Sequence, residues 1–167
     1  TMEPFAMIQP LFWLAVGIML IFILVEDLMS LYIPLWALIG LALLSVMYRF
    51  ALVLFDVMQV QDLLSTYVAA FMITAFFSML HAGTKGRGMG SGDVLLAFPL
   101  VILLGWPRSL VWLFLSFVLG AVIGIILLSV GKAKFRQRIA FGPFMVIATF
   151  ITLLLGDLIW QWYSRFL

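Results

Sequence analysis

The sequence predicts an all-α fold, a polytopic membrane helical bundle with about six transmembrane helices. Of the 167 residues, 66% are hydrophobic and only 10% are charged, and the mean hydropathy is +1.29. This balance lies far outside that of a soluble domain. The apolar residues also gather in runs separated by short polar or glycine-rich breaks, which is typical of membrane helices and their connections. The 9 basic and 7 acidic residues are too dispersed to favour a nucleic-acid partner, so lipid is the expected surroundings.

Six apolar runs are the candidate spans, and they cover roughly residues 5–25, 33–55, 63–80, 94–106, 109–130 and 140–162. Their connections are short enough to join antiparallel neighbours. Since no linker marks a second domain, residues 1–167 are expected to form a single transmembrane domain.

The fourth run is unusually short. A helix from Asp93 to Trp106 rises about 21 Å at 1.5 Å per residue, whereas the hydrocarbon core of a bilayer is roughly 30 Å thick. Asp93 is therefore expected below the membrane surface. Non-helical backbone at that depth is tolerated only beside protein or water, so the glycine-rich segment 83–92 is expected to line a pocket.

The distribution of Lys and Arg residues predicts the orientation. One side carries Lys85, Arg87, Lys132, Lys134, Arg136 and Arg138, and the other carries Arg49, Arg108 and Arg165. Short cytoplasmic loops are enriched in these residues. Asp27 and Asp93 are therefore expected to face the cytoplasm, both termini are expected outside, and the basic stretch 132–138 is interpreted as a topology signal near anionic lipid headgroups.

Asp27 and Asp93 are the candidate catalytic residues. A carboxylate at the mouth of an apolar segment is costly, and Asp93 closes the run Gly88-Met89-Gly90-Ser91-Gly92-Asp93. Two carboxylates that share a proton can hydrolyse a peptide bond: one deprotonates water while the other donates to the scissile carbonyl. Side chains in the run would obstruct a peptide backbone, so Gly88, Gly90 and Gly92 are the candidate substrate loop.

No metal or cofactor is expected. The absence of cysteine excludes a thiolate zinc site and a thiol nucleophile. The lone His81 lacks partner ligands and is interpreted as an interfacial residue.

Three motifs together resemble the type IV prepilin peptidase family of GxGD aspartic membrane peptidases. They are Asp27 seven residues before Pro34, Gly90-Ser91-Gly92-Asp93, and Phe141-Gly142-Pro143-Phe144. Their order and spacing and the six-span layout match from about residue 12 to 163. The resemblance implies that Asp27 and Asp93 are the catalytic pair, with Pro34, Phe141, Gly142 and Pro143 in support. It also implies prepilin-like substrates (pilins, pseudopilins or archaellins), cut at the cytoplasmic membrane face after a basic leader that ends in Gly.

Some positions depart from the family pattern. Leu35 stands where the family often has Asp or Asn, and Leu95 stands where Lys is common. These departures concern substrate detail and leave both acids intact. The chain also lacks the paired Cys-x-x-Cys that the family links to zinc and to methylation of the new N-terminus. Methyltransferase activity is therefore not expected, as in the short members of the family.

Two other functions remain open. A presenilin-like intramembrane protease shares the Gly-x-Gly-Asp signature, but the Tyr-Asp and Pro-Ala-Leu elements of that group are absent. A non-enzymatic assembly or ion-handling membrane protein would use Asp27 and Asp93 to bind a proton or an ion. Tolerance of Asn at both acids would identify this third function. The sequence predicts no oligomeric state.

Overall fold

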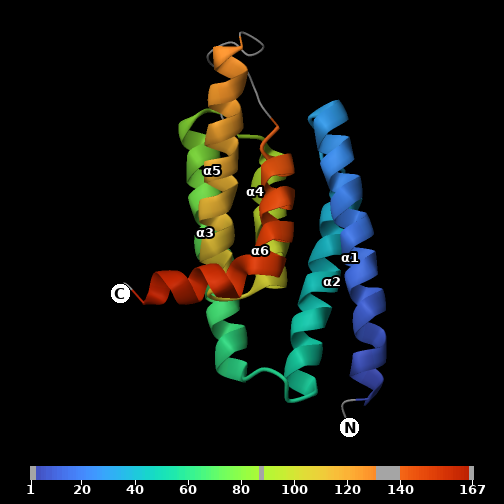
Figure 1. The fold of residues 1–167 in the computed structure, drawn as a ribbon. Coiled ribbons are helices and arrows are strands. Elements are labelled where there is room, and N and C mark those ends of the chain that lie inside the picture. The colour runs from blue at the N-terminus through green and yellow to red at the C-terminus, as the bar shows by residue number, and fades with distance from the viewer. Residues whose placement is uncertain (1–2, 87–88, 131–139, 166–167) are drawn as a thin grey trace.

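The chain forms six helices in the computed structural model, which describes residues 3–86, 89–130 and 140–165 (Figure 1). They are α1 (Glu3–Ser30), α2 (Leu35–Leu54), α3 (Val60–Gly83), α4 (Ser91–Leu104), α5 (Arg108–Ser129) and α6 (Gly142–Ser164). The prediction of an all-α bundle is confirmed, since no strand occurs among these residues. Gly88 and the basic stretch 132–138 lie outside the described residues.

The helices follow the predicted spans in order, with shifted ends. The largest shift is in α1, which continues past residue 25 to Ser30. Asp27 therefore belongs to the last turns of α1 instead of following the span. Five helices, all except α4, are long and apolar enough to cross a membrane. The chain is thus a multi-pass membrane protein with a short helix in its fourth position, as predicted.

The short helix α4 forms the centre of the bundle. It packs against α2, α3, α5 and α6, and nine of its 14 residues are buried. The outer helices instead expose large apolar side chains such as Leu54 and Leu154, which suit contact with lipid. A helix that protein encloses does not need to match the bilayer thickness, because neighbouring helices can satisfy its end groups. The shortness of α4 therefore follows from its central position.

The bundle has two parts that meet mainly at α4 and α6 (Figure 1). The α1–α2 pair lies to one side, and α3, α4, α5 and α6 form the rest; α2 contacts α4, and α1 contacts α6. The C-terminal part of α6 bends away and runs across the other helices. Arg108 at the start of α5 fixes this part through a two-pronged ion pair with Asp157, in which Nε lies 2.6 Å from Oδ1.

An aromatic cluster holds the start of α6 against α3 and α5. The Phe141 ring lies 6.0 Å from that of Phe77 and 5.3 Å from that of Phe117, measured between ring centroids. Below them, the buried indole of Trp112 donates a hydrogen bond to the Met145 carbonyl oxygen at 2.9 Å. Aromatic contacts of this kind stabilise the fold by more than the burial of their apolar area alone would. The N-terminus of α6 is thereby fixed beside the cavity described next.

Candidate functional site

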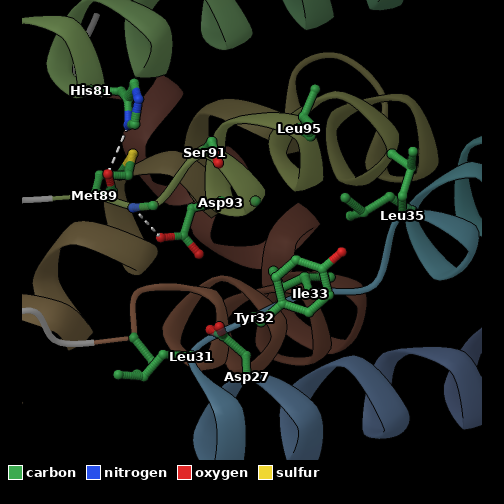
Figure 2. A pocket seen from close by; sticks show the side chains of 14 residues that line it. Asp27, Leu31, Tyr32, Ile33, Leu35, His81, Met89, Ser91, Asp93 and Leu95 are labelled. Atoms are coloured by element: carbon green, nitrogen blue, oxygen red, sulfur yellow. Dashed lines mark hydrogen bonds between the residues drawn. The ribbon is translucent and has the colours of Figure 1, made fainter. Parts of the chain in front are cut away.

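Asp27 and Asp93 line one cavity of about 460 Å³ at one end of the bundle (Figure 2). Asp27 comes from the last turns of α1, and Asp93 comes from the first turn of α4. Each is only 4% exposed. Residues 66 positions apart in sequence thus present two buried carboxyl groups to the same space, and Figure 2 shows both pointing into it.

Gly142, at the start of α6, lies against both carboxyl groups. A Cβ atom added there would overlap Asp27 Oδ2 and would lie 3.3 Å from Asp93 Oδ1. Both oxygens therefore lie within 3.3 Å of one point, which makes the two carboxyl groups close neighbours. The backbone amide of Gly142, at the start of α6, is close enough to both of them to favour their ionised forms. An N-terminal helix amide carries partial positive charge, which suits a site that holds negative charge.

The two carboxyl groups differ in how fully they are hydrogen-bonded. Asp93 Oδ2 accepts the Gly90 backbone N–H at 3.0 Å, so the acid binds back to the residue that precedes its own helix. Asp27 Oδ2 is buried and has no hydrogen-bond partner among the described residues. A buried polar atom without a partner is costly and uncommon in native structures. That oxygen is therefore free to bind a proton, a water molecule or a substrate group.

The last four residues of the predicted pocket-lining segment 83–92 line this cavity, whereas its described residues 83–86 do not. Met89, Gly90 and Gly92 are among the lining residues, and Gly92 already belongs to the first turn of α4. Gly90 has a φ of −72°, an ordinary value for any residue. A Cβ atom at Gly92 would meet Ile33 at 3.5 Å, an ordinary contact distance. Neither glycine is required by backbone strain. A Cβ atom at Gly90 would lie 3.4 Å from Asp93 Oδ2, so glycine at this position keeps side-chain atoms away from that acid.

His81 anchors the same segment from the last turn of α3. Its Nδ1 lies 2.8 Å from the Met89 carbonyl oxygen, and because a carbonyl only accepts, Nδ1 carries the hydrogen in this contact. His81 also lines the cavity. The interpretation of His81 as merely interfacial misses this contact. No motif in the sequence signals it, because it depends on where the segment folds back onto α3.

The supporting residues occupy different places. Pro34 precedes α2, and its carbonyl oxygen accepts the first amides of that helix, while its neighbours Ile33 and Leu35 line the cavity. Phe141 packs in the aromatic cluster. Pro143 is buried in the first turn of α6, where a missing N–H costs little. Within this motif it is Gly142 that reaches the carboxyl groups.

A second buried charge, Arg49, lies at the opposite end of α4. Its Nε donates to the Ile102 carbonyl oxygen at 2.6 Å, and its Nη2 donates to that of Leu103 at 3.0 Å. Gly105, with a φ of +76°, makes room for it, because a Cβ there would overlap the guanidinium. Counting Arg49 as a loop charge is therefore wrong: it lies inside α2, and it caps a helix end within the bundle. The signal available in the sequence is an arginine within an apolar span.

The model of the type IV leader peptidase family matches residues 14–125, a range that includes both aspartates and Pro34 and ends before the Phe-Gly-Pro-Phe motif. No solved structure matches the chain.

Three similar curated proteins carry the name prepilin leader peptidase/N-methyltransferase. The Aeromonas salmonicida protein is 41% identical over 80 residues, which are 48% of this chain and 28% of the relative. The Stutzerimonas stutzeri protein is 36% identical over 100 residues, 60% of this chain and 34% of the relative. The Pseudomonas aeruginosa protein is 34% identical over 100 residues, 60% of this chain and 33% of the relative. The matches thus span about a third of each relative.

Proposed function

The chain belongs to the type IV leader peptidase family, and from this premise we propose that it is an aspartic endopeptidase of the membrane. Its proposed reaction is removal of the basic leader from type IV prepilin-like precursors, which include pilins, pseudopilins and archaellins. The observation that carries the proposal is the pair of buried carboxyl groups, Asp27 and Asp93, that meet at Gly142 in one cavity.

The proposed mechanism uses one proton shared by the two acids. Like charges this close cannot both be ionised cheaply, so the pair holds one proton between them and titrates as a unit. The ionised carboxylate takes a proton from water as the water oxygen bonds to the scissile carbonyl carbon. The protonated partner donates to the carbonyl oxygen, which gives a tetrahedral diol. The C–N bond then breaks as a proton passes to the leaving nitrogen.

Three features of the cavity support this chemistry. Oδ2 of Asp27, which has no hydrogen-bond partner among the described residues, offers a position for the shared proton or for a substrate carbonyl. The Gly142 amide stabilises whichever carboxyl group is ionised. Gly90 and Gly92 carry no side chain beside Asp93, so an extended peptide backbone has more room to come close to that acid.

The proposed orientation places the cavity at the cytoplasmic face. The connections on this side carry most of the Lys and Arg residues. With Arg49 removed from the loop charges of the opposite side, that side retains Arg108 and Arg165, so the asymmetry becomes larger. A basic leader in the cytoplasm would then reach the acids without crossing the bilayer.

Cleavage of membrane-anchored prepilin-like substrates tests the proposal. The native chain is expected to cut at the leader boundary, and Asp27→Asn and Asp93→Asn are each expected to lower the rate by about 10²- to 10⁴-fold while remaining folded. Asp62→Asn is the matched control, because Asp62 is an exposed aspartate at the start of α3. Cleavage that persists in both active-site variants would contradict the aspartic mechanism. A native chain that cuts none of the panel would favour an ion-handling or assembly protein.

A further inference from the structure

The C-terminal part of α6 leaves the direction of its neighbour α5 (Figure 1). Early in α6, the Met145 carbonyl oxygen accepts the hydrogen bond from Trp112 of α5. Gly156 lies 11 residues later, yet a Cβ atom there would lie 3.6 Å from Cγ of Arg108, which is only four residues before Trp112. A straight helix beside α5 would carry Gly156 about 10 Å past Arg108. α6 therefore turns before Gly156, and residues 155–164, which we call the terminal segment, run across the bundle.

Two contacts hold the terminal segment over the connection between α4 and α5. Arg108, the first residue of α5, forms its two-pronged ion pair with Asp157. The Trp160 ring lies 6.3 Å from that of Trp106, which follows α4, measured between ring centroids. Asp93 lies in the first turn of α4, whereas Trp106 lies beyond its last residue. The terminal segment is thus fixed at the end of the bundle opposite the acids.

The terminal segment has an apolar face and a polar face. The apolar face consists of large exposed side chains at helical spacing, which are Leu155, Leu158 and Trp162. The polar face consists of exposed side chains on the opposite side, which are Asp157, Gln161 and Ser164. Amphipathic helices of this kind lie in the plane of a membrane surface, with the apolar face about 5–10 Å into the boundary between headgroups and acyl chains. Since the apolar face continues the lipid-facing surface of the outer helices, lipid is the partner that it fits.

Aromatic residues mark the same end of the bundle as a membrane boundary. Trp and Tyr gather where hydrocarbon meets water, because their rings are apolar and carry a polar group. In the terminal segment, the Tyr163 ring lies 6.1 Å from that of Trp160. On the other side of the bundle, the Trp13 ring lies 5.4 Å from that of Tyr48, which adjoins Arg49 at the C-terminal end of α4. The terminal segment therefore runs at the level of an aromatic belt.

We propose that the terminal segment of α6 is an interfacial helix, which binds lipid at the membrane surface opposite the cavity and fixes the depth of the bundle. This inference goes beyond the proposed peptidase function and does not depend on it. With the C-terminal end of α4 at one boundary, the 14 residues of α4 reach about 21 Å into a hydrocarbon core of roughly 30 Å. The acids then lie about 10 Å inside the opposite boundary.

Spin labels in lipid vesicles test the inference, and the chain has no cysteine of its own to react. The single variants Leu155→Cys, Leu158→Cys, Gln161→Cys and Trp162→Cys each carry a nitroxide in vesicles of phosphatidylcholine and phosphatidylglycerol. Collisions with oxygen, which enters hydrocarbon, are compared with collisions with a water-soluble nickel complex. Labels on the apolar face are expected to favour oxygen and to agree in depth within about 3 Å, whereas the label at residue 161 is expected to favour nickel.

Two reference positions calibrate the labels. Met72→Cys reports hydrocarbon, because Met72 is 68% exposed in the middle of α3. Gln59→Cys reports water, because Gln59 is exposed in the connection before α3.

Two results would overturn the inference. The first is a depth that changes by about 10 Å between the labels at residues 155 and 162, because seven residues along the membrane normal rise that far. The second is nickel access at both positions equal to that at Gln59→Cys, because the segment would then project into water.

A matched pair of charge variants tests the apolar face itself. With the label at Leu155→Cys, Trp162→Glu is expected to raise nickel collisions severalfold, because a carboxylate does not stay in hydrocarbon. Gln161→Glu places the same charge one residue earlier, on the polar face, and is expected to leave the collisions unchanged. An equal response to the two changes, large or absent, contradicts the inference. Since the labels report position and not cleavage, the outcome is separate from that of the peptidase experiment.

Discussion

The two ends of α4 each meet a buried charged group, and they satisfy it to different degrees. At the C-terminal end, the 9% exposed Arg49 donates to two backbone carbonyl oxygens and lies 3.5 Å from the Met58 sulfur. At the N-terminal end, Asp93 accepts one backbone amide, and its neighbour Asp27 leaves Oδ2 without a partner among the described residues. Both charges complement the helix dipole, with the anion at the N-terminus and the cation at the C-terminus.

This difference distinguishes a structural charge from a functional one. A buried cation whose donors meet the orphan carbonyls of a helix end replaces the cap that a short helix in a membrane needs. A buried carboxyl oxygen with no hydrogen-bond partner lowers the stability of the fold. Incompletely satisfied ionisable groups in a cavity are characteristic of reactive sites. The N-terminal end is therefore where chemistry is expected, and the C-terminal end is where stability is expected.

The largest expected effect comes from disturbing the N-terminal end with Gly142→Ala. The added Cβ would overlap Asp27 Oδ2 and would force the carboxyl groups apart. A displacement of about 1 Å at a catalytic group costs roughly 100-fold, so kcat/KM for leader cleavage is expected to fall by about that factor. Gly124→Ala on α5 is the matched control, because a Cβ there meets nothing within 4 Å and Gly124 does not line the cavity. Full activity in the Gly142 variant would show that the pair does not need its present geometry.

The C-terminal end is tested by Arg49→Met, which affects stability first. The change leaves the Ile102 and Leu103 carbonyl groups without their donor, and the free energy of unfolding is expected to fall by about 1–3 kcal/mol. Arg49→Lys is expected to recover only part of it, because an ammonium group cannot reproduce the fork of a guanidinium. Unfolding in detergent measures both, with the exposed Arg165→Met as control. Lost cleavage with unchanged stability would mean that Arg49 belongs with the functional charges.

A smaller effect is expected from His81, which lines the cavity but also holds the segment before α4 in place. His81→Ala removes one hydrogen bond to the Met89 carbonyl group and loosens the segment before Asp93. Because one such bond contributes about 1 kcal/mol, kcat/KM is expected to fall by about three- to tenfold. The control is Thr84→Ala, whose hydroxyl binds carbonyl groups of its own helix. A loss as large as that of Asp93→Asn would place His81 in the reaction itself.

Much of this arrangement can be predicted from sequence, because hydropathy and spacing are local properties. Apolar runs predict the helices, since a helix satisfies its own backbone groups in lipid. The end of α1 is predicted less well: Glu26 and Asp27 look like the start of a loop, yet the helix continues because Asp27 is buried beside α6 and not placed in lipid. The charge of Arg49 wrongly suggests a position in a loop. Arg49 is buried instead, because the carbonyl groups that it binds belong to another helix.

The sequence by itself determined the number and order of the membrane helices, the shortness of α4, and the presence of acids at two helix ends. Only the tertiary structure decided that Gly142 lies against both acids, that Leu35 and Leu95 line the same cavity, and that Arg49 caps α4. The physical reason is distance along the chain. Arg49 and the two carbonyl groups it binds are 53 and 54 residues apart, and no local pattern specifies such contacts before the helices pack.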